Sequence, residues 1–216
     1  MPTSARPRLD RPRILDAAQA IAEAEGVAAV TMRRIGTALG SDPTAVYRHF
    51  ASKDELLREL ADRLFGTLPE TDPSLGWRAT MKAELRHALS RYRHHPDLAL
   101  LLATQPDDTP SLQAIADRML GLLRERGLSD ADAARFTQVL ENHVVGTGLY
   151  YAANGNELRD APAMRRVYAL LDATTHPHAA AVAPHLFPDL DATFDLATDA
   201  LLDAIEAHAE HTKKDR

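Results

Sequence analysis

The spacing of apolar residues constrains the fold of this chain most strongly. Along most of its 216 residues, apolar side chains recur at intervals of three and four, the repeat of an α-helix with one buried face. No segment of useful length alternates apolar and polar residues as a half-buried strand does. The 13 prolines fall mostly between the periodic stretches, where they begin or end helices. The pattern predicts an all-α protein.

Four short helices are predicted in the first 65 residues. Each begins after a side chain that can accept a hydrogen bond from the free amides of a first turn, and these caps are Asp10, Thr31, Asp42 and Ser52. The predicted helices span 10–25, 31–39, 42–50 and 52–64. The first three form a compact three-helix lobe, with the second and third joined by the tight turn Gly40-Ser41-Asp42 and with Pro43 in the first turn of the third.

The third helix can present side chains to DNA. Val46 and Phe50 lie four apart and face inward, so Thr44, Arg48 and His49 lie on outward faces. The major groove accepts one α-helix, and hydroxyl, arginine and amide groups are what bind phosphates and base edges. Two helices with this turn and these side chains predict a helix-turn-helix.

The rest of the chain is predicted to form a second helical lobe. A stretch rich in Pro and Gly, 66–76, separates a front lobe (1–65) from a rear lobe (66–216). Helices are predicted at 77–94, 96–104, 110–126, 130–154, 163–173 and 190–211. Residues 176–188 are predicted to be a broken stretch.

Charge and composition exclude several classes of protein. Residues 1–53 carry eight basic and five acidic side chains, whereas 54–216 carry 17 and 26, so a basic front precedes an acidic body. The absence of cysteine excludes disulfides and thiolate chemistry. No apolar run is long enough for a signal peptide or membrane span, so we expect a cytoplasmic protein with no membrane partner. No cofactor motif is present, and we expect none.

The run 31–57, TMRRIGTALGSDPTAVYRHFASKDELL, resembles the DNA-binding region of the tetracycline repressor (TetR) family. Its markers are Thr31, Leu39-Gly40, Tyr47, Phe50, Lys53 and Leu56-Leu57. The rear lobe resembles the ligand-binding and dimerisation domain of the tetracycline repressor subgroup through His95-Pro96, Leu102 to Pro106, Arg126 to Ser129 and Val144 to Gly148. The resemblance implies a homodimeric repressor that binds a palindromic double-stranded DNA operator and responds to a small-molecule effector.

The resemblance also implies roles for single residues. Arg33 would reach a base edge, Thr44, Ala45, Arg48 and His49 would line the major groove, and Thr31, Tyr47 and Lys53 would hold phosphates. Two of these have a purely structural alternative, because Thr31 can serve only as a helix cap and Tyr47 as a core side chain. Arg6, Arg8, Arg11 and Arg13 form either a minor-groove arm or a solubilising tail.

The effector and dimer sites are predicted in the rear lobe. Polar and aromatic candidates for the effector pocket are Trp77, His87, Thr104, Gln105, Gln138, Asn142 and His143. The resemblance places Leu101 where the tetracycline repressor uses a histidine to hold the magnesium of its drug, so a different effector, apolar or aromatic, is expected. Stripes on the helices 130–154 and 190–211 predict a four-helix dimer interface or, alternatively, an intramolecular core: Phe136, Leu140, Val144, Gly146, Phe194, Ala197, Leu201 and Ile205.

Two other functions compete with this interpretation. A helical metalloenzyme would need ligands at defined spacing, but the ten histidines form no HExxH or di-iron pattern, so no metal site is predicted. No phosphate loop or nucleophile motif suggests other catalysis. A regulator without an effector would also carry the helix-turn-helix, and it would differ by a solidly packed rear lobe.

Overall fold

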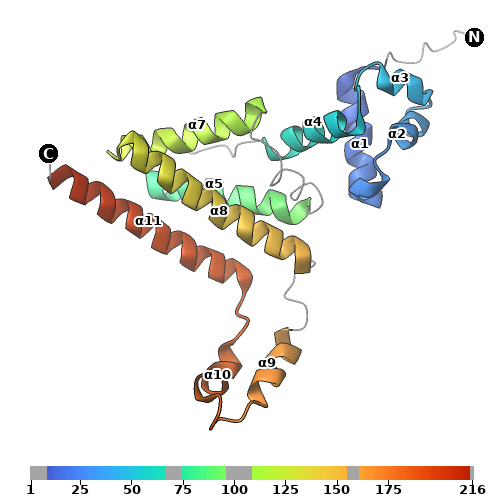
Figure 1. The fold of residues 1–216 in the computed structure, drawn as a ribbon. Helices are drawn as coiled ribbons and strands as arrows, with labels where there is room; N and C mark the ends of the chain where they lie inside the picture. The colour runs from blue at the N-terminus through green and yellow to red at the C-terminus, as the bar shows by residue number, and fades with distance from the viewer. Residues whose placement is uncertain (1–8, 67–73, 96–108, 155–160, 215–216) are drawn as a thin grey trace, which may run out of the picture. The chain divides into compact units, whose positions relative to one another are not determined.

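The computed structural model describes residues 9–66, 74–95, 109–154 and 161–214, and the described part is built from helices (Figure 1). The residues group into two compact units, one from 1–67 and 100–114 and the other from 68–99 and 115–216. The first unit contains α1 (Arg11–Glu25), the short 3₁₀ turn η1 (Val27–Ala29), α2 (Met32–Ala38), α3 (Pro43–Tyr47) and α4 (Lys53–Phe65). The predicted division between residues 65 and 66 stays a prediction.

The four predicted caps of the first unit are confirmed. Asp10, Thr31, Asp42 and Ser52 each accept a hydrogen bond from a backbone amide in the first turn that follows. The capping box at α4 differs in one detail, because the Glu55 carboxylate accepts from the amide of Ala51, 2.7 Å away, rather than from that of the cap itself. This contact ties the turn before α4 to the helix.

Apolar side chains of all four helices form the core of the first unit. Ile14, Ile35, Val46, Phe50 and Leu60 are fully buried. Their spacing in the sequence is that of the predicted inner faces. Removing a side chain of this kind costs about 2–5 kcal/mol.

The third helix is shorter than predicted. It ends at Tyr47 rather than near Phe50, because the amides of His49 and Phe50 both donate to the carbonyl of Val46 and the last turn tightens. Arg48 and His49 therefore lie in the turn between α3 and α4. This turn carries Phe50 into the core.

The second unit contains α5 (Trp77–His94), α7 (Pro110–Glu125) from residue 115 onward, α8 (Asp130–Asn154), α9 (Ala161–Ala169), α10 (Pro177–Val182), the short η2 (Ala183–His185) and α11 (Leu190–Lys214). The stretch predicted to be broken, 176–188, contains the short helix α10 and η2. Pro177 is accepted in the first turn of α10, because that position needs no amide donor. The helix predicted at 96–104 lies outside the described residues.

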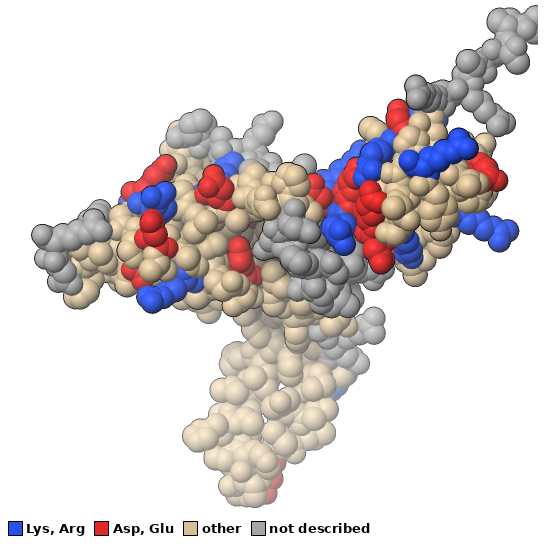
Figure 2. Space-filling view, turned by 45° about the horizontal axis from the view of Figure 1, so that its top comes forward, with Lys and Arg blue, Asp and Glu red and all other residues tan. Residues whose placement is uncertain are grey.

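Helix α9 is joined to the residues that follow η2 by one arginine and one aromatic pair. Arg165 donates from Nε to the carbonyl of Leu186 at 2.7 Å and from Nη2 to that of Phe187 at 2.8 Å. The ring of Tyr168 meets that of Phe187 edge to face at 5.8 Å. Residues 161–188 carry only three charged side chains, and this region is almost uniformly tan in Figure 2.

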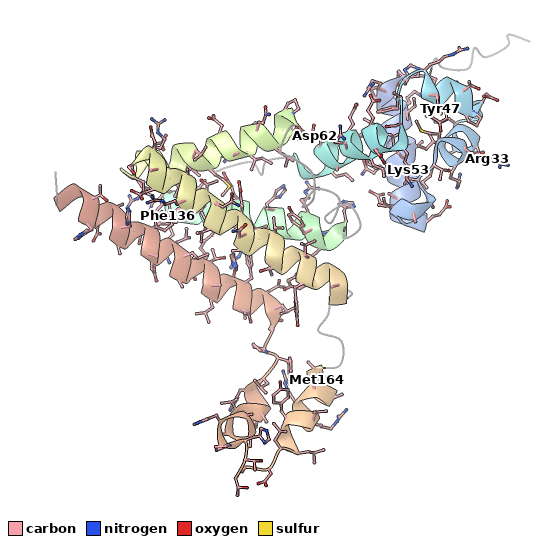
Figure 3. The ribbon with its side chains drawn as sticks, viewed as in Figure 1. Arg33, Tyr47, Lys53, Asp62, Phe136 and Met164 are labelled. Carbon is pink, nitrogen blue, oxygen red and sulfur yellow. The ribbon has the colours of Figure 1, made fainter. Side chains whose placement is uncertain are left out.

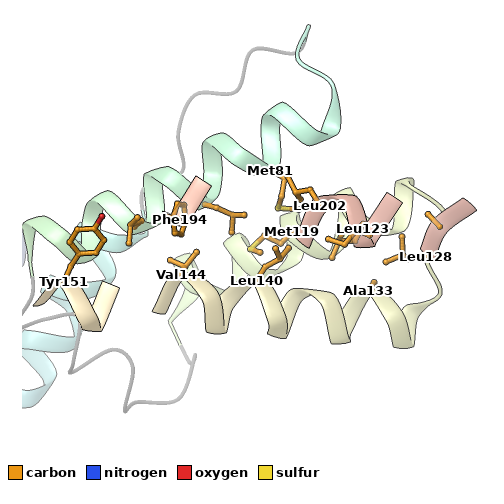
Figure 4. Packing of buried hydrophobic residues seen from close by; sticks show 14 residues of the cluster. Met81, Met119, Leu123, Leu128, Ala133, Leu140, Val144, Tyr151, Phe194 and Leu202 are labelled. Atoms are coloured by element: carbon orange, nitrogen blue, oxygen red, sulfur yellow. The ribbon is translucent and has the colours of Figure 1, made fainter. Parts of the chain in front are cut away.

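The core of the second unit is formed by α5, α7, α8 and α11 (Figure 4). Met81, Leu123, Leu140, Leu202 and Ile205 are fully buried there. The close approach of α5 and α8 depends on a missing side chain, because a Cβ at Gly148 would lie 2.6 Å from the Cβ and Cγ of Tyr92. A β-carbon at Gly146, in contrast, would meet nothing within 4 Å.

A series of ion pairs joins α5 to α11, and we call it the α5–α11 charge ladder. Its basic side chains are Arg78, Lys82, Arg86 and Arg93, and its acidic ones are Asp191, Asp195, Asp199, Asp203 and Glu206. Nitrogen–oxygen distances run from 2.6 Å, between Arg86 and Asp195, to 3.3 Å, between Arg78 and Glu206. The basic groups stand mostly three to four residues apart on one helix face, so the ladder fixes how the two helices align.

The charge ladder predicts a defined dependence of stability on pH. Hydrogen bonds from Lys82 and Arg78 lower the pKa of Asp199 below its ordinary value. A carboxylate of this kind stabilises the fold above its unfolded pKa, about 3.9, and the gain is lost as pH falls through the lower folded pKa. Asp199→Asn should therefore lower the free energy of unfolding at neutral pH and converge with wild type in acid. Urea unfolding at a series of pH values measures this.

The buried carboxylate of Glu84 makes the free energy of unfolding depend on pH in the opposite direction. Burial raises the pKa of Glu84, and the nearby Arg118 offsets this only in part. The contribution of Glu84 to stability is therefore present below its unfolded pKa and is lost as pH rises through its folded pKa.

For Asp199→Asn, a loss of unfolding free energy that is equal at every pH would contradict the assignment of Asp199 to the charge ladder.

Candidate DNA-binding surface and rear-lobe sites

Helix α2 places one arginine outward beside the turn to α3. Met32 and Ile35 are buried, so Arg33 on the opposite side is exposed (Figure 3). The hydroxyl of Thr31 accepts from the amide of Arg34 at 3.1 Å, which establishes its role as a cap. Thr37 is also exposed one turn after Arg33, and the sequence analysis did not single it out.

Helix α3 and the turn that follows it expose side chains that are expected to contact DNA. Thr44 and Arg48 are exposed, and Tyr47 retains 53% of its surface, so Tyr47 is not a core residue. The Thr44 hydroxyl and amide both donate to the carboxylate of Asp42, and these bonds lower the Asp42 pKa, the hydroxyl having the larger effect. The side chains of Asp42 and Thr44 therefore stabilise the first turn of α3.

Three further predicted contacts are partly covered. Ala45, His49 and Lys53 are half-buried, with Lys53 in the first turn of α4. Arg33, Tyr47 and Lys53 are labelled on this unit in Figure 3. The fold brings all eight predicted side chains into one unit around two short helices, which is the arrangement that a helix-turn-helix requires.

The interpretation of Arg11 as part of an arm or tail was wrong. Arg11 is the first residue of α1, and it pairs with Glu55 and Glu59 of α4. Arg13 also belongs to α1, whereas Arg6 and Arg8 lie outside the described residues.

The five rear-lobe pocket candidates that the structure describes do not form one cluster. Trp77 on α5 donates from its indole nitrogen to Glu206 at 3.2 Å, and Arg91 donates to His87 at 3.4 Å. Gln138 and Asn142 are hydrogen-bonded to each other on an exposed face of α8, so they do not line an interior space. Thr104 and Gln105 lie outside the described residues.

His143 is the most enclosed of these candidates. Its ring stacks on Phe194 at 4.5 Å, and its Nε2 lies 3.1 Å from the hydroxyl of Thr198 and 3.3 Å from the carbonyl of Phe194. Burial lowers the pKa of His143, and the bond to the carbonyl opposes this shift. The lowered pKa favours the neutral ring, which links α8 to α11.

A surface hollow of about 380 Å³ lies at the end of α5. It is lined by Arg86, Leu89, Ser90, Arg93, His94 and Asp191, and it contains none of the predicted pocket residues. Its arginines already form ion pairs in the charge ladder.

Half of the residues predicted for the dimer interface belong to the intramolecular core, which is the alternative that the same stripes allowed. Leu140, Val144, Phe194 and Ile205 are at most 4% exposed in the single chain, because they form its own core. Phe136, Ala197 and Leu201 are half-buried against that core, and Gly146 alone of the eight is exposed. Exposed positions of α8 and α11 are instead occupied by Val139, Gly146, Tyr150, Leu196, Ala200 and Ala204.

Metal clusters and membrane-spanning helices are both absent from the described residues. In that part of the chain, no three side chains of His, Asp or Glu come together as a metal site would require. No described helix combines the length and the apolar character needed to cross a membrane.

Two protein-family models match this chain. The model described as "Bacterial regulatory proteins, tetR family" matches residues 14–60, and that described as "Tetracyclin repressor-like, C-terminal domain" matches residues 68–209. The chain is 31% identical over 215 residues to the HTH-type transcriptional repressor DrrR1 of Streptomyces coeruleorubidus, covering 93% of this chain and 78% of that protein.

Solved structures of similar proteins cover nearly the whole chain. ActR of Streptomyces coelicolor in complex with actinorhodin has a TM-score of 0.83 and 26% identity, covering 94% of this chain and 97% of that one. BioQ of Mycobacterium smegmatis, crystallised with its double-stranded DNA operator, has a TM-score of 0.67 and 25% identity, covering 93% and 100%. The fold, the exposed side chains of α2 and α3 and these matches together define a helix-turn-helix regulator of transcription. The chain belongs to the TetR family.

Proposed function

We propose that this protein is a homodimeric repressor that binds a palindromic operator through α2 and α3 and is released by a small-molecule effector. The observation that carries the proposal is the placement of Arg33, Thr44 and Tyr47 on the exposed sides of two short helices whose other sides are buried, with Arg48 exposed in the turn that follows α3. An arginine aimed at the major groove can pair bidentately with guanine. We propose the same eight contacts that the sequence predicted.

In the proposed dimer, two chains meet through the solvent-exposed faces of α8 and α11. Small side chains such as Gly146, Ala200 and Ala204 let helices approach closely, and Leu196, 73% exposed, and Tyr150, 47% exposed, supply apolar area. Two copies of this pair would form a four-helix interface around a two-fold axis. A two-fold dimer presents its recognition helices to successive major grooves about 34 Å apart, which explains a palindromic operator.

The effector part of the proposal rests on the rear unit and on ActR, whose structure was solved with actinorhodin. We propose an apolar or aromatic effector that binds better when the two DNA-binding units are wrongly spaced, so that its binding weakens operator affinity by linkage. Actinorhodin is a suitable first probe. Operator affinity that no compound alters would favour the alternative, a regulator without effector.

The remaining elements of the proposal follow from the family. Its named members are regulators, and we propose that this chain has no catalytic activity and works in the cytoplasm, where the chromosome is accessible. We propose domain limits of 1–65 for DNA binding and 66–216 for effector binding and dimerisation.

Selection of genomic fragments with the purified protein, followed by footprinting at stated salt, tests the proposal. A protected palindrome occupied by a dimer supports it. Retention that is sequence-independent and salt-sensitive, or no retention, contradicts it.

Arg48 and Lys53 should differ in what they contribute to binding. Arg48→Ala is expected to cost about 1–3 kcal/mol on the selected operator and to relax the preference at one base position, because a bidentate pair is lost. Lys53→Ala is expected to weaken all sequences alike and to reduce the salt slope by about one, because a phosphate contact is lost. Affinity measurements on matched and mismatched duplexes at several salt concentrations separate the two. Equal behaviour of both variants would contradict the assignment.

A further inference from the structure

The turn between α3 and α4 has few internal hydrogen bonds to fix it. The amides of His49 and Phe50 donate to Val46, and that of Ala51 donates to the carboxylate of Glu55. The turn nevertheless carries Arg48 and joins α3 to Lys53, two of the proposed DNA contacts.

One side chain from the start of α1 reaches this turn. Nη1 of Arg11 donates to the carbonyl of His49 at 2.5 Å, and Nη2 donates to Glu55 at 3.1 Å. The same guanidinium also pairs with Glu59. Its plane lies over the ring of Phe50, with the central carbon 4.1 Å from the ring centroid.

These contacts use the planar fork of an arginine fully. A guanidinium can donate in several fixed directions and stack on an aromatic face at the same time, whereas an ammonium cannot. Glu55 joins the network from both sides, because one of its oxygens accepts from Arg11 and the other from the amide of Ala51. The backbone of the turn is thus bound at His49 and at Ala51.

We propose that Arg11 is a positioning residue for DNA recognition, which holds the α3–α4 turn so that Arg48 and Lys53 keep a fixed relation to α3. We call Arg11, Glu55 and Glu59 the turn clamp. The proposal rests on the proposed DNA-binding function. Its local part, immobilisation of the turn, does not depend on DNA.

The same unit contains a matched control. Arg63 pairs with Asp16 at 2.7 Å and thereby links α4 to α1, as Arg11 does. The two arginine side chains are almost equally exposed, 42% and 41%, and within the described residues Arg63 makes no hydrogen bond or ion pair with the α3–α4 turn. Alanine at either position removes one positive charge and one link between the same helices. Only the change at Arg11 removes the clamp.

Amide hydrogen exchange tests the local part in the full chain. Arg11→Ala and Arg11→Lys should speed exchange of the His49, Phe50 and Ala51 amides about tenfold, the size expected when a charge-assisted hydrogen bond is lost. Arg63→Ala should leave these amides at the wild-type rate. Equal acceleration in Arg63→Ala, or none in the Arg11 variants, would overturn the clamp. A wild-type rate in Arg11→Lys would show that charge rather than the fork matters and would overturn it as well.

The ratio of specific to non-specific DNA affinity tests the functional part. This ratio cancels the general effect of losing one positive charge. We expect it to fall about tenfold in both Arg11 variants and to stay unchanged in Arg63→Ala, at a temperature where thermal unfolding shows all of them folded. An unchanged ratio in the Arg11 variants overturns the positioning role. If wild type shows no specific binding, the proposed function fails, and the exchange rates still decide whether the clamp exists.

Discussion

Replacing Gly36 with valine is expected to abolish specific operator binding. A β-carbon at this position would lie 2.9 Å from the carbonyl oxygen of Ser41 and 3.2 Å from the nitrogen of Pro43. Both are backbone atoms of the turn between α2 and α3, so no side chain can move aside. The amide of Ser41 also donates to the carbonyl of Gly36 at 2.8 Å, which holds the turn tightly against α2. The added atoms must push the two helices apart.

The expected cost of Gly36→Val is about 3 kcal/mol, the upper end for overpacking a tight contact, since valine also restricts a helical residue. Ala38→Val is the matched control, because Ala38 lies on an exposed side of the same helix. Thermal unfolding and operator affinity should both be close to wild type in the control and far below it in Gly36→Val. Operator binding by Gly36→Val at wild-type strength would contradict the role of this contact in spacing α2 and α3.

The first unit could be predicted from the sequence in most of its detail. Its caps are short-range signals, read from one side chain and the amides two or three residues later, and all four are confirmed. The end of α3 could not be predicted, because it depends on Phe50 entering the core and on Arg11 binding a carbonyl 38 residues away. Sequence periodicity contains no information on a contact of that kind.

In the second unit, the spacing of apolar residues predicts the buried helix faces but not what they pack against. The stripe that includes Leu140 and Ile205 was found correctly, yet a stripe does not reveal whether its partner is the same chain or a second copy. The charge ladder was missed because its two halves are more than 90 residues apart, and each half alone reads as a solvated face. The exposed small residues Ala200 and Ala204 carry too little hydrophobicity to mark an interface in advance.

Two arginines on the free face of α11 should convert the proposed dimer into a monomer. Ala200 and Ala204 stand one helical turn apart and are exposed in the single chain, so Ala200→Arg combined with Ala204→Arg should leave the chain folded. In the proposed dimer this face meets a symmetry-related copy, and four like charges would be buried together, which is strongly unfavourable. Sedimentation should then report a single chain at concentrations where wild type is a dimer.

Loss of the dimer should have a large effect on DNA binding. Two linked recognition units gain from a high effective concentration of the second, and its loss typically reduces affinity by about 10² or more. We therefore expect the double variant to bind the full palindrome about as weakly as an isolated half-site. Arginine at Ala79, an exposed position of α5, is the control for added charge and should remain dimeric. A double variant that stays dimeric and holds the palindrome normally would show that the interface lies elsewhere than on this face of α11.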